Sequence, residues 1–124
     1  TTDNTRREAQ AVQDAAETLH ENFVKRAFQT DSICQLATAS PHPVLVCGDF
    51  NSLPSSYTYH RFSESLKDGF KTGGHGYMYT YRYGKRMLRI DYAFHSPELE
   101  CTDYYSPNLD LCSDHNPVIF TVKY

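Results

Sequence analysis

The most informative segment of the chain reads Val44-Leu45-Val46-Cys47-Gly48-Asp49-Phe50-Asn51. Its first four residues are apolar, and a short apolar run that ends at a glycine predicts a β-strand buried on both faces. Asp49 and Asn51 then stand at the end of that strand. A rigid sheet can aim side chains at its strand ends into a common cleft. This strand end is therefore the first candidate for a functional site.

Helices are predicted on both sides of this strand. Upstream, residues 5–29 form an amphipathic pattern, because apolar side chains recur every three or four positions between charged ones. The predicted apolar face consists of Ala9, Val12, Ala16, Leu19, Phe23 and Ala27. A second apolar stretch, 33–39, can continue helically until Pro41 stops it. Downstream, residues 52–66 predict a short helix, and the glycines between 69 and 76 mark a loop.

The rest of the chain has the pattern of β-structure. Residues 77–83 and 87–94 predict a hairpin that turns at Gly84-Lys85, and 98–105 and 118–124 predict two further strands. Alternation divides the strand at 87–94 into two faces. One face carries Leu88, Ile90, Tyr92 and Phe94, and the other carries Arg89 and Asp91. Together these elements predict an α/β chain with one mostly antiparallel sheet and flanking helices.

Polar residues cluster at the ends of three predicted strands. Besides the segment that contains Asp49 and Asn51, the clusters are Arg89-Ile90-Asp91-Tyr92 and Ser113-Asp114-His115-Asn116-Pro117. Hydrolysis of a phosphoester needs a metal ligand, a group that holds the attacking water, and a donor for the charge that develops. Acids, an amide and an imidazole can supply these three functions together.

Each cluster by itself has a simpler explanation. A Gly-Asp pair after a strand is often a turn in which the Asp accepts backbone hydrogen bonds. Asp91 could pair with Arg89 or Arg82 across the hairpin, and His115 could lie in a solvated loop. The chemical interpretation therefore depends on all three clusters occurring in one chain.

In their order along the chain, the three clusters resemble the last three signature blocks of the endonuclease/exonuclease/phosphatase superfamily. The resemblance covers residues 44–122, and the helix at 5–29 resembles the one that precedes the first of these blocks in many members. The resemblance implies metal-dependent hydrolysis of phosphoester bonds. Water would attack phosphorus in line, while Mg²⁺ or Mn²⁺ polarises the phosphoryl oxygen.

The resemblance also implies a role for each matching residue. Asp49 would position or deprotonate the attacking water, and Asn51 would fix the water and the phosphate. Asp91 would accept a hydrogen bond from His115, which sets the tautomer of the imidazole and favours its charged form. His115 would then donate to the scissile phosphate. We expect these four side chains to line one cleft, with Asp91 and His115 within hydrogen-bonding distance.

Two further residues complete the predicted site, and the sequence leaves the chemical class of the substrate undecided. Asp114 matches a carboxylate in or beside the metal site, and Arg89 is the predicted contact to the substrate. Tyrosines and cations between 77 and 89 could stack bases and hold phosphates, which favours a nuclease or phosphodiesterase over a lipid or sugar phosphatase. The same tyrosines could simply fill a sheet core.

Charge and hydropathy exclude some modes of binding. The formal net charge is −3, so overall electrostatic attraction to nucleic acid is not indicated, and a phosphoester must be recognised locally. The chain contains no apolar run long enough to span a membrane. The sequence does not indicate a cellular compartment.

The family's N-terminal signature blocks, which include an Asn and a metal-binding Glu, have no counterpart in residues 1–124. The resemblance therefore implies that residues 1–124 are the C-terminal portion of a single domain, half of a four-layer αββα sandwich. The missing N-terminal half, or self-association through the open sheet face, would complete it, and the chain alone would be inactive. The other hypothesis is a non-catalytic binding or assembly module, which would not require the acids, the amide and the imidazole together.

Overall fold

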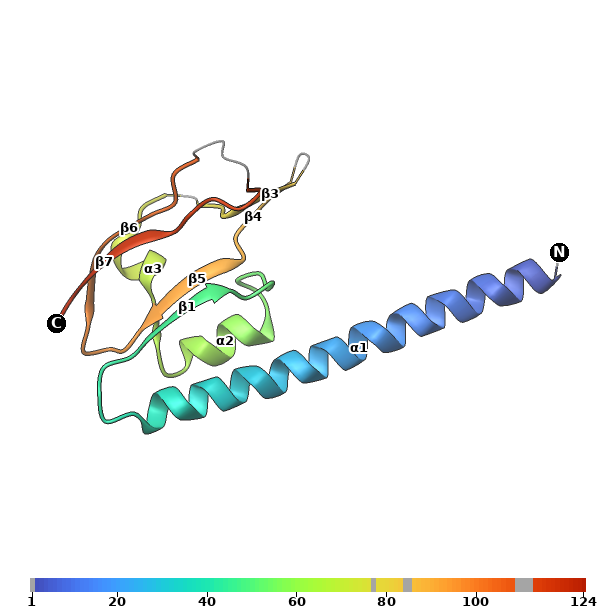
Figure 1. Ribbon diagram of the computed structural model, residues 1–124, viewed down its shortest axis with the longest axis horizontal. Coiled ribbons are helices and arrows are strands. Elements are labelled where there is room, and N and C mark those ends of the chain that lie inside the picture. The colour runs from blue at the N-terminus through green and yellow to red at the C-terminus, as the bar shows by residue number, and fades with distance from the viewer. Residues whose placement is uncertain (1, 77, 84–85, 109–112) are drawn as a thin grey trace.

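The computed structural model describes residues 2–76, 78–83, 86–108 and 113–124. In chain order its elements are α1 (Thr2–Ala39), β1 (Leu45–Asp49), α2 (Tyr57–Ser63), β2 (Lys67–Asp68), α3 (Gly69–Gly73), β3 (Tyr81–Tyr83), β4 (Arg86–Leu88), β5 (Asp91–His95), β6 (Glu100–Tyr105) and β7 (Ile119–Lys123). Figure 1 shows α1 and α2 on one side of β1 and β5, and β6 and β7 on the other. The predicted α/β class with antiparallel strands is confirmed.

Strand β5 is the centre of the largest sheet, whose strand order is β1-β5-β2. Both neighbours run antiparallel to it. In the described residues β3 pairs with β4, and β6 with β7, as separate two-stranded sheets. The register between β1 and β5 places Asp49 opposite Asp91. Because directly opposed residues project from the same face of a sheet, the fold itself brings these two carboxylates together.

Two hydrophobic clusters pack against opposite faces of β5, as its alternation predicts. Tyr92 and Phe94 pack toward α1 and α2. The cluster on that side contains Cys34, Tyr59, Phe62, Leu66, Tyr92 and Phe94. Ala93 belongs to the second cluster, with Met78, Cys101 and Tyr104. Asp91 is two residues before Ala93 in the same strand and therefore projects from the same face, toward the side where β6 and β7 lie.

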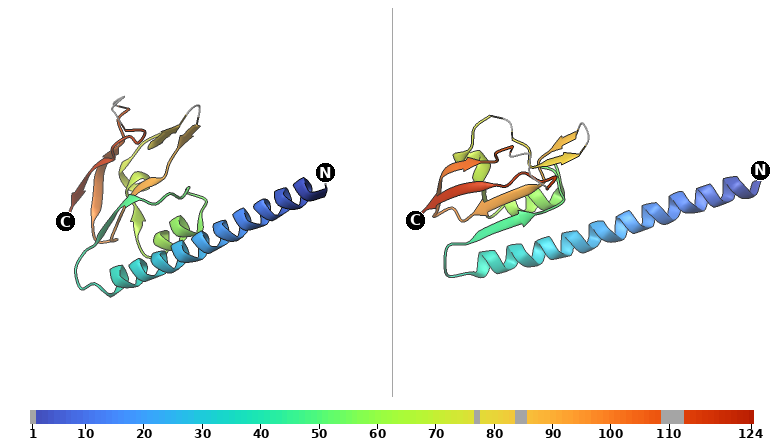
Figure 2. Two further views of the ribbon diagram at one scale, coloured as in Figure 1. Left: turned by 45° about the vertical axis from the view of Figure 1, so that its right-hand side comes forward. Right: turned by 45° about the horizontal axis from the view of Figure 1, so that its top comes forward.

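Helix α1 joins the two helical stretches predicted at 5–29 and 33–39 into one element of 38 residues. Figures 1 and 2 show its N-terminal part extending away from the rest of the molecule. Thr30 and Cys34 are buried, because the C-terminal part of α1 packs beside α2. Val12 and Leu19 are 70% and 71% exposed. Among the described residues, α1 is therefore covered near its C-terminal end, and most of the apolar face predicted at 5–29 is exposed.

Two predictions about strands need correction. The strand predicted at 44–47 is not buried on both faces: Val46 packs against the first hydrophobic cluster, whereas the other residues of β1 are exposed. The strand predicted at 87–94 is divided into β4 and β5, because the chain leaves the hairpin with β3 and pairs with β1 instead. The predicted turn at Gly84-Lys85 lies outside the described residues.

The helices after β1 also differ from the prediction. Helix α2 is shorter than 52–66, and it begins after Ser56, whose hydroxyl accepts a hydrogen bond from the N–H of Tyr59 as an N-cap. The segment predicted as a loop at 69–76 contains α3, capped in the same way by Asp68. No described helix combines the length and the apolar character that crossing a membrane requires.

Candidate active site

Three segments that are distant in sequence bring their polar side chains to one edge of the central sheet. Asp49 ends β1, Asp91 begins β5, and His115 lies in the segment before β7. The backbone of His115 forms an isolated bridge with Tyr81 of β3, and the two rings lie 5.0 Å apart between centroids. The position of His115 is thus set by β3, whereas the pairing of β1 with β5 sets the two carboxylates.

The imidazole of His115 lies between the carboxylates of Asp49 and Asp91. Its Nδ1 is 2.8 Å from Oδ2 of Asp91, and its Nε2 is 3.8 Å from Oδ2 of Asp49. An ionised carboxylate can only accept, so Nδ1–H donates to Asp91 and Nε2 is the ring atom that faces Asp49. The predicted contact between Asp91 and His115 is confirmed. We call Asp49, Asp91 and His115 the acid–imidazole cluster.

The charge of the cluster is balanced by the imidazole. Carboxylates directly opposed across two strands repel each other, and a protonated His115 between Asp49 and Asp91 offsets that repulsion. The hydrogen bond to Asp91 raises the pKa of His115 above its ordinary value, and the negative charges of Asp91, Asp49 and Asp114 act in the same direction against partial burial. His115 therefore keeps its proton to a higher pH than a free histidine.

Asn51 adopts a backbone conformation that few residues tolerate. Its φ is 48°, in the left-handed region where Asn is enriched among non-glycine residues. The N–H of Asn51 donates to Oδ1 of Asp49 at 2.9 Å, so one oxygen of Asp49 holds this turn while the other faces His115. Asn51 is exposed, and the turn places it directly after the carboxylate with which it was predicted to act.

Three cavities include residues of the predicted site. The first, of about 590 Å³, contains the whole acid–imidazole cluster beside the half-buried Val118 and Phe120. The second, of about 340 Å³, lies between α1 and β1 and contains Asp49 and Asn51. The third, of about 500 Å³, contains Asn51 and His115. The four residues predicted to act together are thus accessible from connected surfaces.

Arg26 in α1 is a candidate that the sequence did not single out. It lines the cavity between α1 and β1, together with Gln29, Thr30 and Ile33. The spacing of three, four and seven residues places all four on one face of the helix, which is the signal that could have identified them. Arg26 is the one Arg or Lys among the described residues that line these three cavities. It is exposed and has no ion pair in the described part of the chain.

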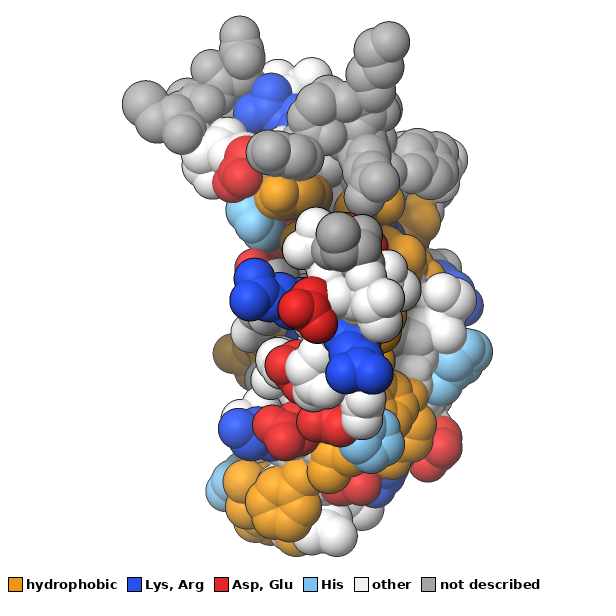
Figure 3. All heavy atoms as spheres, turned by 90° about the vertical axis from the view of Figure 1, so that its right-hand side faces the viewer, with side chains coloured by type: hydrophobic (Ala, Val, Ile, Leu, Met, Phe, Trp, Pro, Cys, Tyr) orange, Lys and Arg blue, Asp and Glu red, His pale blue; other side chains and the backbone are white. Residues whose placement is uncertain are grey.

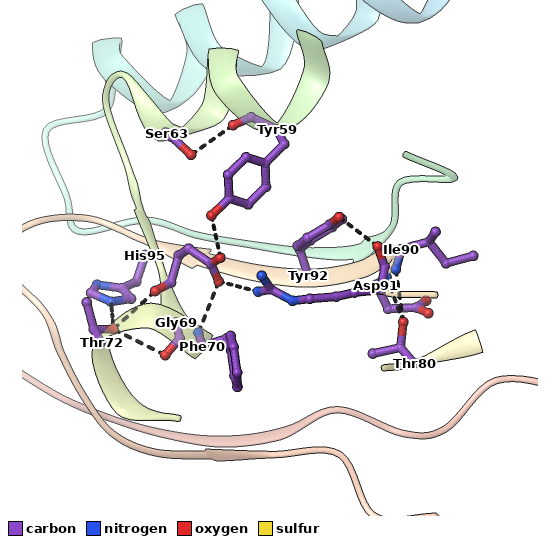
Figure 4. Close-up of polar contacts among 12 residues, drawn as sticks. Tyr59, Ser63, Gly69, Phe70, Thr72, Thr80, Ile90, Asp91, Tyr92 and His95 are labelled. Carbon is purple, nitrogen blue, oxygen red and sulfur yellow. Dashed lines mark hydrogen bonds and ion pairs between the residues drawn. The ribbon is translucent and has the colours of Figure 1, made fainter. Parts of the chain in front are cut away.

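Arg89 lies apart from the acid–imidazole cluster. Its guanidinium is 8% exposed and donates to Asp68 at 2.6 Å, and it packs over the rings of Phe70 and Tyr92. Figure 4 shows this buried network, in which Tyr59 also donates to the carboxylate that the arginine contacts. The break between β4 and β5 turns Arg89 inward, so in this structure its charge is paired inside the protein and does not face the cavities of the site.

Asp114 lies beside the cluster without belonging to it. Its side chain is exposed and lines the third cavity with Asn51 and His115, while its backbone carbonyl accepts a hydrogen bond from Arg82. The three residues whose ligand atoms lie within 4.8 Å of one another are Asp49, Asp91 and His115. The prediction that Asp114 binds metal therefore stays a prediction.

An acid–imidazole cluster at the strand ends of an α/β fold is typical of hydrolytic enzymes. The sequence model of the Endonuclease/Exonuclease/phosphatase family matches residues 14–115, and the chain belongs to this family. Members of the family include nucleases and phosphatases, and they hydrolyse phosphoesters. Comparison with curated protein sequences gave no match.

Solved structures share the fold. An endonuclease/exonuclease/phosphatase from Bacteroides vulgatus is 25% identical with a TM-score of 0.67, over 79% of this chain and 43% of that one. A functionally unknown conserved protein from Enterococcus faecalis V583 is 19% identical with a TM-score of 0.65, over 79% and 44%. The mannosyl-6-phosphatase of Bacteroides thetaiotaomicron VPI-5482 is 23% identical with a TM-score of 0.56, also over 79% and 44%. This chain spans less than half the length of each.

Proposed function

We propose that this chain supplies the acid–imidazole part of an active site that hydrolyses phosphoester bonds. The observation that carries the proposal is the position of His115, whose Nδ1 is held by Asp91 and whose Nε2 faces Asp49. The raised pKa of His115 favours the form in which Nε2 carries a proton. A cationic donor fixed in this way can stabilise the negative charge that develops on a phosphoryl oxygen.

The proposed reaction assigns one task to each side chain. Asp49 accepts the proton of a water molecule, whose oxygen attacks phosphorus from the side opposite the leaving oxygen. The ester P–O bond breaks as the new bond forms, and the leaving oxygen takes its proton from solvent. The amide of Asn51 donates to the phosphate and orients it. His115 donates from Nε2 to a phosphoryl oxygen, while Asp91 stays ionised and fixes the ring. Proton transfer and charge stabilisation by positioned side chains each contribute large factors to rate.

The carboxylates of the cluster fit a divalent metal better than its imidazole does. Mg²⁺ and Mn²⁺ prefer oxygen ligands, and Asp49 offers an exposed carboxylate whereas Nδ1 of His115 is occupied by Asp91. We infer that Asp114, which lines the third cavity with Asn51 and His115, would hold the ion beside the cluster, while Asp49 stays free to take the proton of the water. When bound, such an ion would polarise the phosphoryl oxygen.

We infer a phosphodiester, recognised locally, as the favoured substrate. The ring of Tyr81 packs on His115 at the edge of the third cavity and can stack a base or another planar group. Arg26 would contact the phosphate from the neighbouring cavity. On the described part of the face in Figure 3, basic and acidic side chains are interspersed, which argues against a broad basic surface. A sugar phosphate, the kind of substrate named for one similar structure, is the second candidate.

We also propose that the working site needs more protein than these residues. Similar structures are more than twice as long as the matched part of this chain, and the first cavity is open beside the half-buried Val118 and Phe120. The rest of the same protein, or a second copy of this chain, would cover that face and complete the metal site.

A substrate panel tests this function. The chain, alone and together with the N-terminal portion of its own protein, would be assayed with Mg²⁺ on bis(p-nitrophenyl) phosphate, an oligonucleotide and mannose 6-phosphate. We expect hydrolysis of the diesters that chelation abolishes, with oxygen from ¹⁸O-labelled water appearing on phosphorus. Hydrolysis of the sugar phosphate alone would select the second candidate. Binding without hydrolysis of any substrate would favour the non-catalytic module and contradict the proposal.

A further inference from the structure

We propose that Thr80 is a positioning residue, which holds the starts of two segments so that Asp91 and His115 meet. This inference rests on the proposed function for its catalytic consequence, but the contacts that carry it are independent of that function. Thr80 is fully buried. It lies one residue before β3, next to the point at which the chain passes from β4 into β5.

The hydroxyl of Thr80 holds the first residues of β5. Its Oγ1 accepts hydrogen bonds from the N–H groups of Ile90 at 3.1 Å and of Asp91 at 3.0 Å. Figure 4 shows Thr80 beside these two residues. A hydroxyl oxygen has two acceptor lone pairs, so two backbone donors occupy its full accepting capacity. The backbone of Asp91 is thus anchored by a side chain at the point where β5 begins.

The main chain of Thr80 holds the segment that carries His115. The carbonyl oxygen of Thr80 accepts the N–H of Asn116 at 2.6 Å, and the N–H of Thr80 donates to the carbonyl of Leu88 at 2.9 Å. One buried residue therefore contacts the backbone of Asp91 through its hydroxyl and the neighbour of His115 through its carbonyl. These two segments carry Asp91 and His115, whose Oδ2 and Nδ1 atoms lie 2.8 Å apart.

The hydroxyl is needed because the sheet is interrupted there. Between β4 and β5 the chain leaves its pairing with β3 and begins to pair with β1. The N–H of Ile90, which precedes β5, finds its acceptor in Thr80 instead of a strand. A buried N–H without an acceptor costs about 1–3 kcal/mol, so a residue of the same shape without the hydroxyl would favour a shifted start of β5. Asp91 would move away from His115 with it.

The test compares three variants of the full chain. Thr80→Val keeps the shape and removes the acceptor, whereas Thr80→Ser keeps the acceptor and removes a methyl group. The matched control is Thr72→Val, because Thr72 also bonds to β5, through Nε2 of His95 at the other end of the strand. The readout is the NMR resonance of the Nδ1 proton of His115, which lies downfield while Nδ1–H donates to Asp91. Circular dichroism checks that each variant is folded.

We expect the downfield resonance in the wild type, in Thr80→Ser and in Thr72→Val, and its loss in folded Thr80→Val. With a substrate, Thr80→Val should lower kcat by at least about tenfold and leave KM nearly unchanged, because small misplacements of catalytic groups are costly. A retained resonance in Thr80→Val, or an equal loss in Thr72→Val, would overturn the proposal. If Thr80→Val does not fold, Thr80→Ser becomes the deciding variant, because it keeps the hydroxyl. Absence of the downfield resonance in folded Thr80→Ser would contradict a role for the hydroxyl.

The two readouts separate this proposal from the proposed function. The resonance reports the contact between His115 and Asp91 whether or not any substrate is hydrolysed. A wild-type chain that stays inactive together with the N-terminal portion of its protein would therefore reject the function and leave the positioning role of Thr80 to be decided by NMR.

Discussion

The hydrogen bond from His115 to Asp91 controls the charge of the imidazole. Replacing Asp91 with Asn removes the acceptor charge that contributes most to the raised pKa of His115, so we expect that pKa to fall toward the ordinary value for histidine, as an NMR titration would show. If His115 donates in its protonated form, as we propose, the alkaline limit of activity should move to lower pH. An unchanged titration in Asp91→Asn would contradict this assignment.

The same contact links pH to stability. The folded state binds the proton of His115 more tightly than the unfolded state does, so its stabilising contribution is fully present below the ordinary pKa of histidine. That contribution is lost as the pH rises through the raised value of the folded protein. Asp91→Asn should therefore lose more stability at acidic pH than at alkaline pH, as urea denaturation at several pH values would measure.

Arg26 is the cation that we expect to hold the substrate phosphate. Arg26→Gln should raise KM by about tenfold, equivalent to about 1.4 kcal/mol of binding free energy, with little change in kcat. Lys25→Gln is the matched control, because Lys25 is a neighbouring exposed cation on the same helix that does not line the cavity. Equal effects of the two changes on KM would show that general charge, and not a contact by Arg26, holds the phosphate.

Sequence patterns found the acid–imidazole cluster because its members stand at strand ends in short polar clusters. They could not find Thr80, since its importance comes from an interruption of the sheet that brings residues 80, 91 and 116 together. The pattern also placed Arg89 on the same face as Asp91. The break between β4 and β5 turns it into a buried ion pair with Asp68, and alternation along one strand cannot reveal such a break.

Strand β5 is the element on which both cores depend. Phe94 is fully buried between α2 and the sheet, and Phe94→Ala should lower the free energy of unfolding by about 3–5 kcal/mol. Phe28→Ala is the control, because Phe28 is 74% exposed on α1 and a surface change of this kind costs less than about 0.5 kcal/mol. Similar decreases in the free energy of unfolding for Phe94→Ala and Phe28→Ala, measured by urea denaturation, would mean that β5 is not the centre of the core.

The type of most elements was easier to predict than their number and their partners. The alternation along 87–94 predicted that Tyr92 and Phe94 lie on one face of β5 and Asp91 on the other, and an apolar run predicted β1. Burial of β1 on both faces was predicted wrongly. The composition of an apolar strand does not reveal whether other elements cover both of its faces. The resemblance implies that this chain is one part of a larger fold, and a strand that further protein would cover fits that expectation.

The described part of the chain leaves apolar surface uncovered along its longest helix. Exposed apolar side chains follow α1, including Val12, Leu19 and Phe28. Burying apolar surface contributes about 25 cal/mol per Å². We therefore expect the isolated chain to self-associate in sedimentation experiments through this surface and through the open face beside Val118 and Phe120. The N-terminal portion of its protein should replace the second contact when it is added. A folded, active monomer would contradict the expectation.

The turnover of a single variant tests the central claim most directly. His115→Ala, assayed with Mg²⁺ in the complete protein on the best substrate of the panel, should lower kcat by roughly two orders of magnitude or more, because the donor to the phosphate is lost. His42→Ala should keep wild-type turnover, since His42 is exposed and lies outside the described cavities of the site. Wild-type turnover in a folded His115→Ala variant would contradict the account.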